Sequence, residues 1–366
     1  MTAPNKPFTP PPYPYDRLDE ITGLANAHEG GAVDLSIGTP CDPPPAAVVE
    51  AFGVGDTMRG YPPSIGTPGL RLAAAEWISR RLGATVDPAT EVAAVVGTKE
   101  FVASTPQYLK LRDPSRDTVL YPAISYPTYE MGAILAGCRP VPYQQLGDIA
   151  EDDAARALCV WVNSPNNPTG ELHDLAAAAA WGRARDIAVL SDECYAEFTW
   201  TGGPTTILRE GTQGVLAVHS LSKRDNFAGA RIGFYAGDAD LVHYLREVRK
   251  HAGFMPAGPV QAAAIVALGD DAHVEVQRER YLRRLTTLRD LVHTLGYDAE
   301  LPAGAFYLWV AAPHGDAWAA ARDLATRAGI VCSPGEFYGP SSTGWFRLAA
   351  VQPDERIALA ASRVAG

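Results

Sequence analysis

Residues 214–223 read Gly-Val-Leu-Ala-Val-His-Ser-Leu-Ser-Lys, an apolar stretch that ends in Ser220, Ser222 and Lys223. A second apolar stretch, Ile-Ala-Val-Leu at 187–190, is followed by Ser-Asp-Glu-Cys-Tyr at 191–195. Short apolar runs with polar residues at their ends are typical of buried strands. In open α/β sheets, ligands bind outside the carboxyl ends of the strands. The two stretches therefore predict an α/β fold whose binding site contains Lys223, Asp192 and Tyr195.

A lysine and an aspartate at two strand ends indicate a particular chemistry. The amine of Lys223 can form a Schiff base with a carbonyl group. Asp192 can pair with a pyridinium nitrogen, because an opposite charge close by favours the charged form of that ring. These two roles are what a pyridoxal 5'-phosphate (PLP) site requires of a protein. The pair therefore indicates PLP as the cofactor.

Length and composition limit the other possibilities. The chain has 366 residues, 47% hydrophobic and 20% charged, which suits a globular protein with an ample core. A single core rarely grows beyond about 250 to 300 residues, so we expect two domains. The formal charge of −11 argues against a nucleic-acid surface, which needs clustered lysine and arginine. No apolar run reaches the roughly 18 to 20 residues that span a bilayer. Residues 1–7 lack the apolar core of a signal peptide. These features predict a cytoplasmic protein that binds neither nucleic acid nor membrane.

The cysteines give little indication of function. They are scattered, at Cys41, Cys138, Cys159, Cys194 and Cys332. Their spacing fits neither a metal site nor a disulfide framework, so we expect no metal and interpret them as free thiols. Cys194 lies between candidate site residues, but we interpret it as a small buried spacer rather than a nucleophile.

The middle of the chain alternates helical and short apolar segments, which is typical of a mostly parallel sheet. Strands are predicted at residues 92–96, 117–121, 139–143, 157–162, 187–190, 215–219 and 231–235. The clearest helix spans residues 175–185, with Asp174 as its expected N-cap.

The two ends of the chain differ from this middle region. Five of the eight residues from Pro7 to Pro14 are proline, which excludes a helix interior. They predict an extended arm, either loose or lying on a partner subunit. A helix at about 16–27 and a strand at 33–37 should follow. Towards the C-terminus we expect a long amphipathic helix at 275–295 that could bridge two lobes and a helix near 318–328. A strand pair around Val331 and residues 345–348, and a last helix begun by Pro353-Asp354, should follow. The expected domains are 1–36 (the arm and part of the small domain), 37–271 (the large PLP-binding domain) and 272–366 (the small domain).

Five motifs occur in one order along the chain. They are Gly97-Thr98-Lys99-Glu100, Tyr126-Pro127-Thr128-Tyr129, Asn163-Ser164-Pro165-Asn166-Asn167-Pro168-Thr169-Gly170, Asp192-Glu193-Cys194-Tyr195, and Ser220-Leu221-Ser222-Lys223 followed by Arg231. Together they resemble the fold-type I PLP-dependent aminotransferases of class I and II, from about Ser36 to Arg347. The resemblance implies an α/β PLP-transferase fold: a large domain with a mostly parallel seven-stranded sheet flanked by helices, and a smaller α+β domain.

The resemblance also implies roles for residues around the cofactor ring. Lys223 is the catalytic lysine that holds PLP covalently and, once released, acts as the base at the substrate's Cα. Asp192 pairs with the ring nitrogen, and Asn167 and Tyr195 with the phenolic oxygen. Tyr126 stacks on the ring, although a Tyr-Pro-x-Tyr turn could equally be a packing feature.

Further implied contacts concern the phosphate and the partner subunit. Thr98 and Lys99, at an expected helix start, would bind the phosphate together with Ser220 and Arg231. Tyr61 would reach the phosphate of the neighbouring subunit, so the resemblance implies a homodimer with shared active sites.

The implied activity moves an amino group from an amino acid to a 2-oxo acid, with 2-oxoglutarate as the expected acceptor. Arg347 would grip the substrate α-carboxylate, with contacts from Gly38 and Asn167. Residues 219–231 and 249–255 are similar to actinobacterial N-succinyldiaminopimelate aminotransferases of lysine biosynthesis. This similarity predicts N-succinyl-L,L-diaminopimelate as the donor. Candidate partners of its distal carboxylate are the basic side chains of Lys99, Arg224 and Lys250.

Other activities stay open at this point. The same motifs fit aspartate-, aromatic- or kynurenine-type aminotransferases and C–S β-lyases. A transcription regulator with an aminotransferase-like domain would need a DNA-binding domain before Ser36. The residues there are proline-rich and acidic, so we do not expect one.

Overall fold

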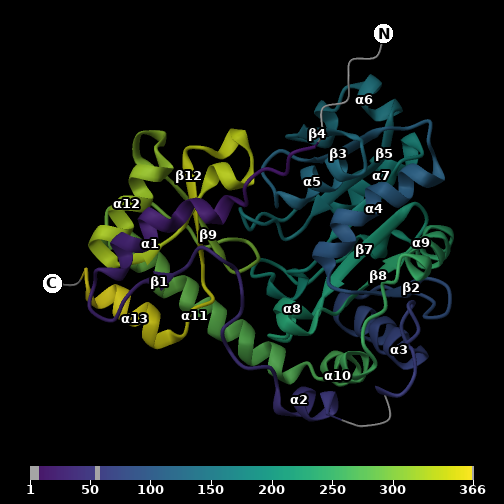
Figure 1. Cartoon of the computed structure of the whole chain (residues 1–366), viewed down its shortest axis with the longest axis horizontal. Coiled ribbons are helices and arrows are strands. Elements are labelled where there is room, and N and C mark those ends of the chain that lie inside the picture. Colours follow the sequence, from purple (N-terminus) through teal and green to yellow (C-terminus); the bar gives the residue numbers. More distant parts are fainter. Residues whose placement is uncertain (1–7, 54–57, 365–366) are drawn as a thin grey trace.

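The computed structural model describes residues 8–53 and 58–364. Seven strands form its central sheet, in the order β2-β8-β7-β6-β5-β3-β4 (Figure 1). They are β2 (Val92–Val95), β3 (Thr118–Pro122), β4 (Arg139–Tyr143), β5 (Ala157–Asn163), β6 (Ala188–Asp192), β7 (Val215–Ser220) and β8 (Gly233–Gly237). Each coincides with a predicted strand. Only β8 runs antiparallel to its neighbours, so the mostly parallel seven-stranded sheet is confirmed.

The inner strands are apolar because helices cover both faces of the sheet. All residues of β5 and β7 are buried, the pattern expected of strands with two covered faces. Side chains of α4, α5 and α9 share one apolar cluster with the sheet, and those of α2, α3, α7 and α10 share another.

The helices of this region are α2 (Ala46–Phe52), α3 (Pro68–Trp77), α4 (Thr98–Arg112), α5 (Thr128–Leu135), α6 (Glu151–Ala155), α7 (Leu175–Arg185), α8 (Leu221–Arg224), α9 (Ala239–His251) and α10 (Gly258–Gly269). The helix α7 has the predicted bounds. Its predicted N-cap is confirmed, since Asp174 Oδ1 accepts a 2.8 Å hydrogen bond from the backbone N–H of Ala177.

A second group of elements combines the start and the end of the chain. It contains α1 (Asp19–Asn26), β1 (Val33–Asp34), α11 (Ala272–Thr294), β9 (Tyr307–Ala311), α12 (Ala317–Ala328), β10 (Ile330–Val331), β11 (Ser333–Pro334), β12 (Trp345–Ala349) and α13 (Asp354–Ser362). In Figure 1, the purple α1 lies beside the yellow-green α12, with which it packs. Side chains from both ends of the chain share one apolar cluster.

Several boundaries in this second group differ from the sequence prediction. The predicted helix at 16–27 begins as a 3-10 turn (Pro14–Leu18) before α1, and the predicted strand at 33–37 contains only two paired residues. The strand pair predicted around Val331 and residues 345–348 forms two residues further on, where β11 pairs with β12. Val331 itself lies in β10, which pairs with β1. Neighbouring short strands cannot be paired from periodicity alone, because several registers bury the same side chains. The predicted domain bounds remain predictions.

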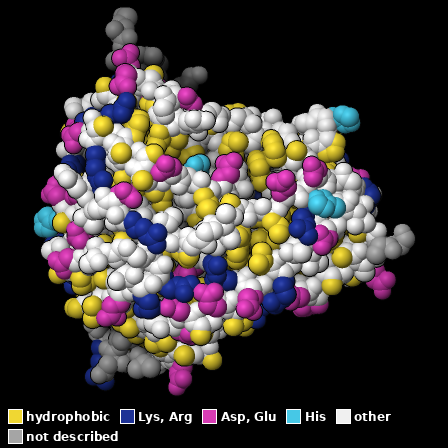
Figure 2. Space-filling model, turned by 180° about the vertical axis from the view of Figure 1, so that it is seen from behind, with side chains coloured by type: hydrophobic (Ala, Val, Ile, Leu, Met, Phe, Trp, Pro, Cys, Tyr) yellow, Lys and Arg dark blue, Asp and Glu magenta, His cyan; other side chains and the backbone are white. Residues whose placement is uncertain are grey.

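Some predictions concern the ends and the surface. Residues 1–7 lie outside the described residues. They include the start of the proline-rich arm, and the expected lack of a signal peptide stays a prediction. Among the helices that the structure describes, none is long and apolar enough to cross a membrane. The face shown in Figure 2 carries acidic and basic side chains interspersed with one another.

Candidate active site

A cavity of about 290 Å³ lies where the carboxyl ends of the central strands face the second group of elements. It is lined by eleven of the twelve residues predicted for the site: Gly38, Thr98, Lys99, Tyr126, Asn167, Asp192, Tyr195, Ser220, Lys223, Arg231 and Arg347. These residues come from distant parts of the sequence, so the fold brings the predicted set together. Tyr61 is the member that does not line it.

Lys223 follows β7 on the short helix α8 and is half-buried. Its Nζ donates a hydrogen bond to the carbonyl oxygen of Gly38. Burial, together with the positive charges of Arg347 and Arg231, lowers the pKa of this amine to about 8. The neutral amine is the nucleophilic form, so this environment gives Lys223 more of that form near neutral pH than an exposed lysine has.

Asp192 ends the strand β6 and is buried. Its Oδ2 accepts a 2.9 Å hydrogen bond from Tyr129 Oη, and its Oδ1 accepts one of 3.2 Å from the backbone N–H of Cys194. Burial raises the pKa of this carboxyl. Within the described part of the chain, Asp192 forms no ion pair. A buried carboxylate in this situation is stabilised by a cationic ligand group.

One corner of the cavity is suited to an anion. The helix α4 begins there with Thr98 and Lys99, and the backbone N–H groups of a first helical turn attract negative charge. Ser220 lies beside this helix start as the N-cap of α8. The guanidinium of Arg231 comes so close that a Cβ at Gly97 would lie 2.1 Å from its Nη2, which explains the glycine at φ 76°.

Arg347 projects from β12 and is buried. Its Nη1 donates to Asn167 Oδ1 at 2.8 Å, and its Nη2 donates to the carbonyl oxygen of Ser36. The guanidinium carbon lies 4.2 Å from the ring centroid of Tyr307 and 4.8 Å from that of Tyr338. Its Nε has no partner among the described residues. The stacked rings hold the fork rigid, so its unused donors can bind a carboxylate.

Two neighbouring contacts orient the polar groups beside Arg347. The backbone N–H of Asn167 donates to the side chain of Asn163 at 2.8 Å, which fixes the turn that carries Asn167. The hydroxyls of Tyr195 and Tyr307 lie 2.8 Å apart. Burial raises the pKa of Tyr195, so its phenol remains protonated.

Three predicted contacts with substrate or partner need separate comment. Arg224 does not line the cavity: its buried side chain belongs to an ion-pair cluster behind the site, so the prediction that it binds a distal carboxylate is wrong. Lys250 is outside the cavity as well and pairs with Glu247 at 2.7 Å. Tyr61 is 97% exposed and lines a separate surface hollow.

The cavity also contains phenols that the sequence prediction missed. Tyr13, Tyr15 and Tyr307 line it, as does Tyr129, which stood in a quoted motif without an assigned role. Lys99 Nζ lies 5.3 Å from the ring centroid of Tyr13. Tyr13 and Tyr15 stand in or beside the proline-rich arm, and Tyr307 stands in a short strand. None of these positions indicates a binding site from the sequence alone.

Cys194 lines the cavity, where its Sγ donates to the hydroxyl of Thr98 at 3.3 Å. Burial and the nearby Asp192 raise the pKa of this thiol well above its usual value. A thiol that stays protonated is a poor nucleophile, in keeping with its interpretation as a spacer.

Comparison with known proteins identifies similar chains. The sequence matches the family model of aminotransferase class I and II over residues 31–364. It is 42% identical to the 4-dedimethylamino-4-oxo-anhydrotetracycline transaminase OxyQ of Streptomyces rimosus, over 97% of this chain and 99% of that protein. It is 34% identical to the LL-diaminopimelate aminotransferase of Aquifex aeolicus, over 97% of this chain and 96% of that protein. The solved structure of a probable N-succinyldiaminopimelate aminotransferase from Thermus thermophilus is similar with a TM-score of 0.83, at 28% identity over 96% of this chain and 98% of that one.

Proposed function

The chain belongs to the class I and II aminotransferases, a PLP-dependent family that acts on amino acids and 2-oxo acids, and we propose that the cavity around Lys223 is its active site. The observation that carries this proposal is the convergence of a buried amine, a buried unpaired carboxylate and an anion-binding corner in one cavity. Each of these three features matches a different chemical group of PLP.

The residues present fit the cofactor. When bound, PLP supplies an electron sink for the charge that develops when the substrate's Cα–H bond breaks. Lys223 would hold it covalently, and Asp192 would pair with its ring nitrogen. The backbone N–H groups of Thr98 and Lys99 at the start of α4, with Ser220 and Arg231, would hold its phosphate. Tyr126, Asn167 and Tyr195 would contact the ring and its phenolic oxygen.

The chain's own groups then position the substrate and move its proton. Arg347 would bind the substrate α-carboxylate with its unused N–H donors, and Gly38 and Asn167 would flank that carboxylate. The released amine of Lys223 would take the proton from the substrate's Cα and pass it to the bound cofactor. The lowered pKa of Lys223 suits this role, because an efficient base has a pKa near the working pH.

We further propose that the amino donor carries a second carboxylate far from the reacting amine, and that it is N-succinyl-L,L-diaminopimelate, with 2-oxoglutarate as acceptor. Support comes from the sequence on both sides of Lys223 and from relatives that are named as LL-diaminopimelate or probable N-succinyldiaminopimelate aminotransferases. Of the three cations considered for the distal acid, only Lys99 lines the cavity. A single ammonium contact favours a diacid over an apolar donor by a kcal/mol or more, roughly tenfold in kcat/KM.

A second candidate function rests on a different observation. Six tyrosines line the cavity (Tyr13, Tyr15, Tyr126, Tyr129, Tyr195 and Tyr307), and the relative OxyQ is named for an anhydrotetracycline substrate. Phenol rings provide flat apolar faces with a polar edge, which suit an aromatic donor. An aromatic or kynurenine-type aminotransferase is therefore the alternative.

We also propose that the protein is a homodimer with shared active sites. Tyr61 is almost fully exposed and lies in a hollow with Pro62, Gly258 and Ile265. In a dimer its hydroxyl would reach the phosphate in the partner's site. Light scattering should give the mass of a dimer, and Tyr61→Phe should weaken PLP retention. A monomeric active enzyme would contradict this proposal.

A half-reaction screen tests the donor. The PLP-loaded enzyme is mixed with one amino acid at a time, and the loss of the visible cofactor absorbance is followed. The panel contains N-succinyl-L,L-diaminopimelate, LL-diaminopimelate, glutamate, aspartate, phenylalanine and kynurenine, with cystathionine to detect β-elimination. We expect the succinylated diacid to react fastest. A faster aromatic donor would favour the second candidate, and pyruvate from cystathionine would indicate a lyase.

A further inference from the structure

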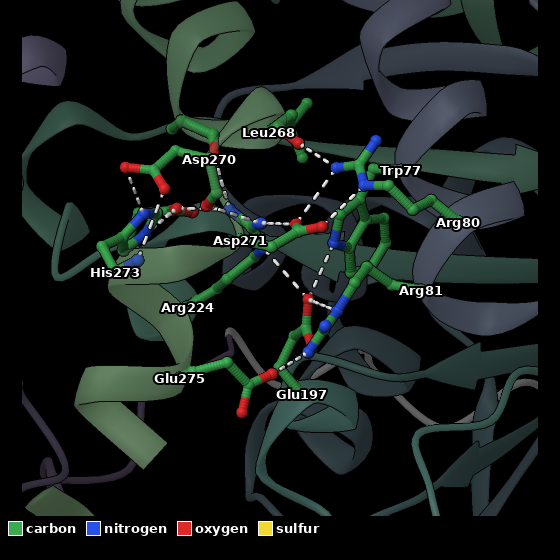
Figure 3. Close-up of polar contacts among 12 residues, drawn as sticks. Trp77, Arg80, Arg81, Glu197, Arg224, Leu268, Asp270, Asp271, His273 and Glu275 are labelled. Atoms are coloured by element: carbon green, nitrogen blue, oxygen red, sulfur yellow. Dashed lines mark hydrogen bonds and ion pairs between the residues drawn. The ribbon is translucent and has the colours of Figure 1, made fainter. Parts of the chain in front are cut away.

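A buried cluster of charged side chains lies directly behind Lys223, outside the active-site cavity. Figure 3 shows Arg224 at its centre, with acidic groups around it and with Arg80 and Arg81 on its outer side. The side chain of Arg224 is only 4% exposed. Its guanidinium contacts Glu197 Oε1 at 3.3 Å, Asp271 Oδ1 at 3.1 Å, the carbonyl oxygen of Ala267 at 2.7 Å, and the carboxylate of Asp225.

These contacts join three segments of the fold. Glu197 lies in the segment that follows Asp192, the last residue of β6; we call this segment, residues 193–198, the Asp192 loop. Arg224 itself ends the helix α8, immediately after Lys223. Asp271 lies at the junction of α10 and α11. The guanidinium of Arg224 therefore ties the Asp192 loop to α8, the helix that carries Lys223.

Most polar atoms of the cluster have partners, as such burial requires, although Asp225 Oδ2 accepts no hydrogen bond from the described residues. Glu197, with a side chain 3% exposed, also accepts from Trp77 Nε1 at 2.8 Å and pairs with Arg81 at 2.9 Å. Asp225 is fully buried and pairs with His273 as well. Removing one partner of a buried ion pair leaves an uncompensated charge. Only an arginine fork can reach several acceptors at once in a fixed geometry, because the lysine ammonium is a point charge.

The helix α8 needs such an anchor. It has four residues, and a helix this short is not stable by itself. Lys223 lines the active-site cavity, whereas Arg224 lines a small hollow on the other side, with Trp77 and Glu197. A rotation or shift of α8 would therefore move both side chains together.

We propose that Arg224 is a positioning residue for Lys223: its guanidinium locks α8 against the Asp192 loop and so sets where the amine of Lys223 points. This inference rests on the proposed function, in which Lys223 holds PLP and moves the substrate's proton. A misplacement of the base by about 1 Å can cost roughly 10²-fold in rate. The effect should appear in kcat, because Arg224 touches no part of the substrate cavity.

The test compares Arg224→Gln and Arg224→Lys with the control Arg80→Gln, all loaded with PLP. Arg80 is an arginine of the same cluster that binds Asp271 at 2.6 Å and the carbonyl oxygen of Leu268, but it contacts no residue of α8. Each variant is measured for Tm, kcat and KM, and for the pH midpoint of the visible absorbance of bound PLP. We expect Arg224→Gln to lower kcat by roughly 10²-fold with KM little changed, and to move the pH midpoint. Arg224→Lys should recover part of the loss, and Arg80→Gln should change Tm alone.

A double variant keeps the test decisive if Arg224→Gln fails to fold. Arg224→Gln combined with Glu197→Gln removes the charges of both partners, and Arg81 keeps its 2.6 Å ion pair with Glu275. A folded double variant with a low kcat and a moved pH midpoint supports positioning. Variants with a lowered Tm but with wild-type kcat and pH midpoint would overturn the inference and leave Arg224 a stabilising residue.

Mapping the borohydride-reduced wild-type enzyme separates this inference from the proposed function. If the pyridoxyl label lies on another lysine, the proposed site itself is wrong. If the label lies on Lys223 and the Arg224 variants behave like wild type, only the positioning role fails.

Discussion

Asn167 accepts a 2.8 Å hydrogen bond from Nη1 of Arg347, and this bond joins the loop after β5 to the strand β12. Asn167 follows a strand of the seven-stranded sheet and Arg347 belongs to a strand of the three-stranded sheet, so the bond links the two parts of the fold. Asn167 is proposed to contact both cofactor and substrate, and Arg347 the substrate carboxylate. Their bond therefore aligns the substrate grip with the cofactor site before any ligand arrives.

Replacement of Arg347 by lysine should weaken the binding of every amino acid and 2-oxo acid. An ammonium cannot contact Asn167, the Ser36 carbonyl oxygen and a carboxylate together. Loss of one charged hydrogen-bonded contact costs about 1.5 to 3 kcal/mol, roughly ten- to hundredfold in affinity. Substrate KM and the inhibition constants of simple dicarboxylates measure this effect. Unchanged values for both would make Arg347 a structural residue.

Asp192→Asn should retain PLP but lose most turnover. The amide keeps the shape of the side chain: its oxygen can accept from the backbone N–H of Cys194, and its NH2 group can donate to Tyr129 Oη. The negative charge beside the ring nitrogen disappears. Removal of an electrostatic contact of this kind commonly costs roughly 10²-fold or more in kcat. Tyr129→Phe is the matched control, because it removes a hydrogen bond and keeps the charge. A fully active Asp192→Asn would mean that another acid serves the ring.

The pH dependence of cofactor capture should report on Lys223. Burial lowers the pKa of its amine to about 8, so the reactive neutral form accumulates as pH rises towards 8. We expect the rate at which the PLP-free protein captures the cofactor to rise about tenfold per pH unit below that value and to level off above it. Stopped-flow absorbance measures the rate. A rate that continues to rise to pH 10 would indicate an exposed lysine, and Lys223→Ala should capture none covalently.

Lys99→Met should lower the preference for donors with a distal carboxylate. The ammonium of Lys99 lies over the rings of Tyr13 and Tyr126, at 5.3 and 5.8 Å from their centroids, on the cavity wall. We expect the ratio of kcat/KM for glutamate over phenylalanine to fall about tenfold, which corresponds to about 1.4 kcal/mol of lost contact. Lys250→Met, outside the cavity, is the control and should leave the ratio unchanged. If Lys99→Met and Lys250→Met changed this ratio equally, Lys99 would not be the partner of the distal carboxylate.

Glu193→Gln should change how stability depends on pH. Glu193 lies in the core, where Ser191 Oγ and the backbone N–H of Ile207 donate to it and His219 Nε2 lies 3.5 Å away. Burial raises the pKa of Glu193 from 4.5 to about 7. Between these values the unfolded chain releases its proton first, so this residue costs the wild type stability as pH rises from about 4.5 to 7. Burial lowers the pKa of His219 to about 3. This shift makes stability rise with pH below about 6.5, but the wild type and the glutamine variant both contain that histidine.

The comparison of the two proteins therefore isolates the carboxyl. The glutamine variant should gain stability relative to the wild type between pH 5 and pH 8, by about 1.4 kcal/mol for each pH unit between 5 and 7, where the unfolded carboxyl is ionised and the folded one is not. Urea midpoints at both pH values measure the difference. A difference that is the same at pH 5 and pH 8 would show that Glu193 ionises normally.

Much of the large sheet could be predicted from the sequence. Six of the seven strands are short, almost wholly buried runs separated by helical segments, and their burial on two faces makes them largely apolar. The exception is the edge strand β4, which is partly exposed. The motif residues followed, because Lys223 and Asp192 stand at strand ends, and parallel strands deliver such residues to one edge. Local pattern and chain direction were sufficient for this part of the site.

Other features depended on contacts between distant segments. The pairing of β10 with β1, the phenols of Tyr13, Tyr15 and Tyr307 in the cavity, and the place of Arg224 have no local signature. Three basic residues near motifs have three different surroundings. Lys99 lines the cavity, Arg224 lies in a buried ion-pair cluster, and Lys250 pairs with Glu247 on the surface. The sequence by itself determined the sheet, the family and the residues at the strand ends, because those follow from periodicity and motif chemistry. Only the tertiary structure decided which side of each element faces the cavity, because that depends on packing against segments that are remote in the chain.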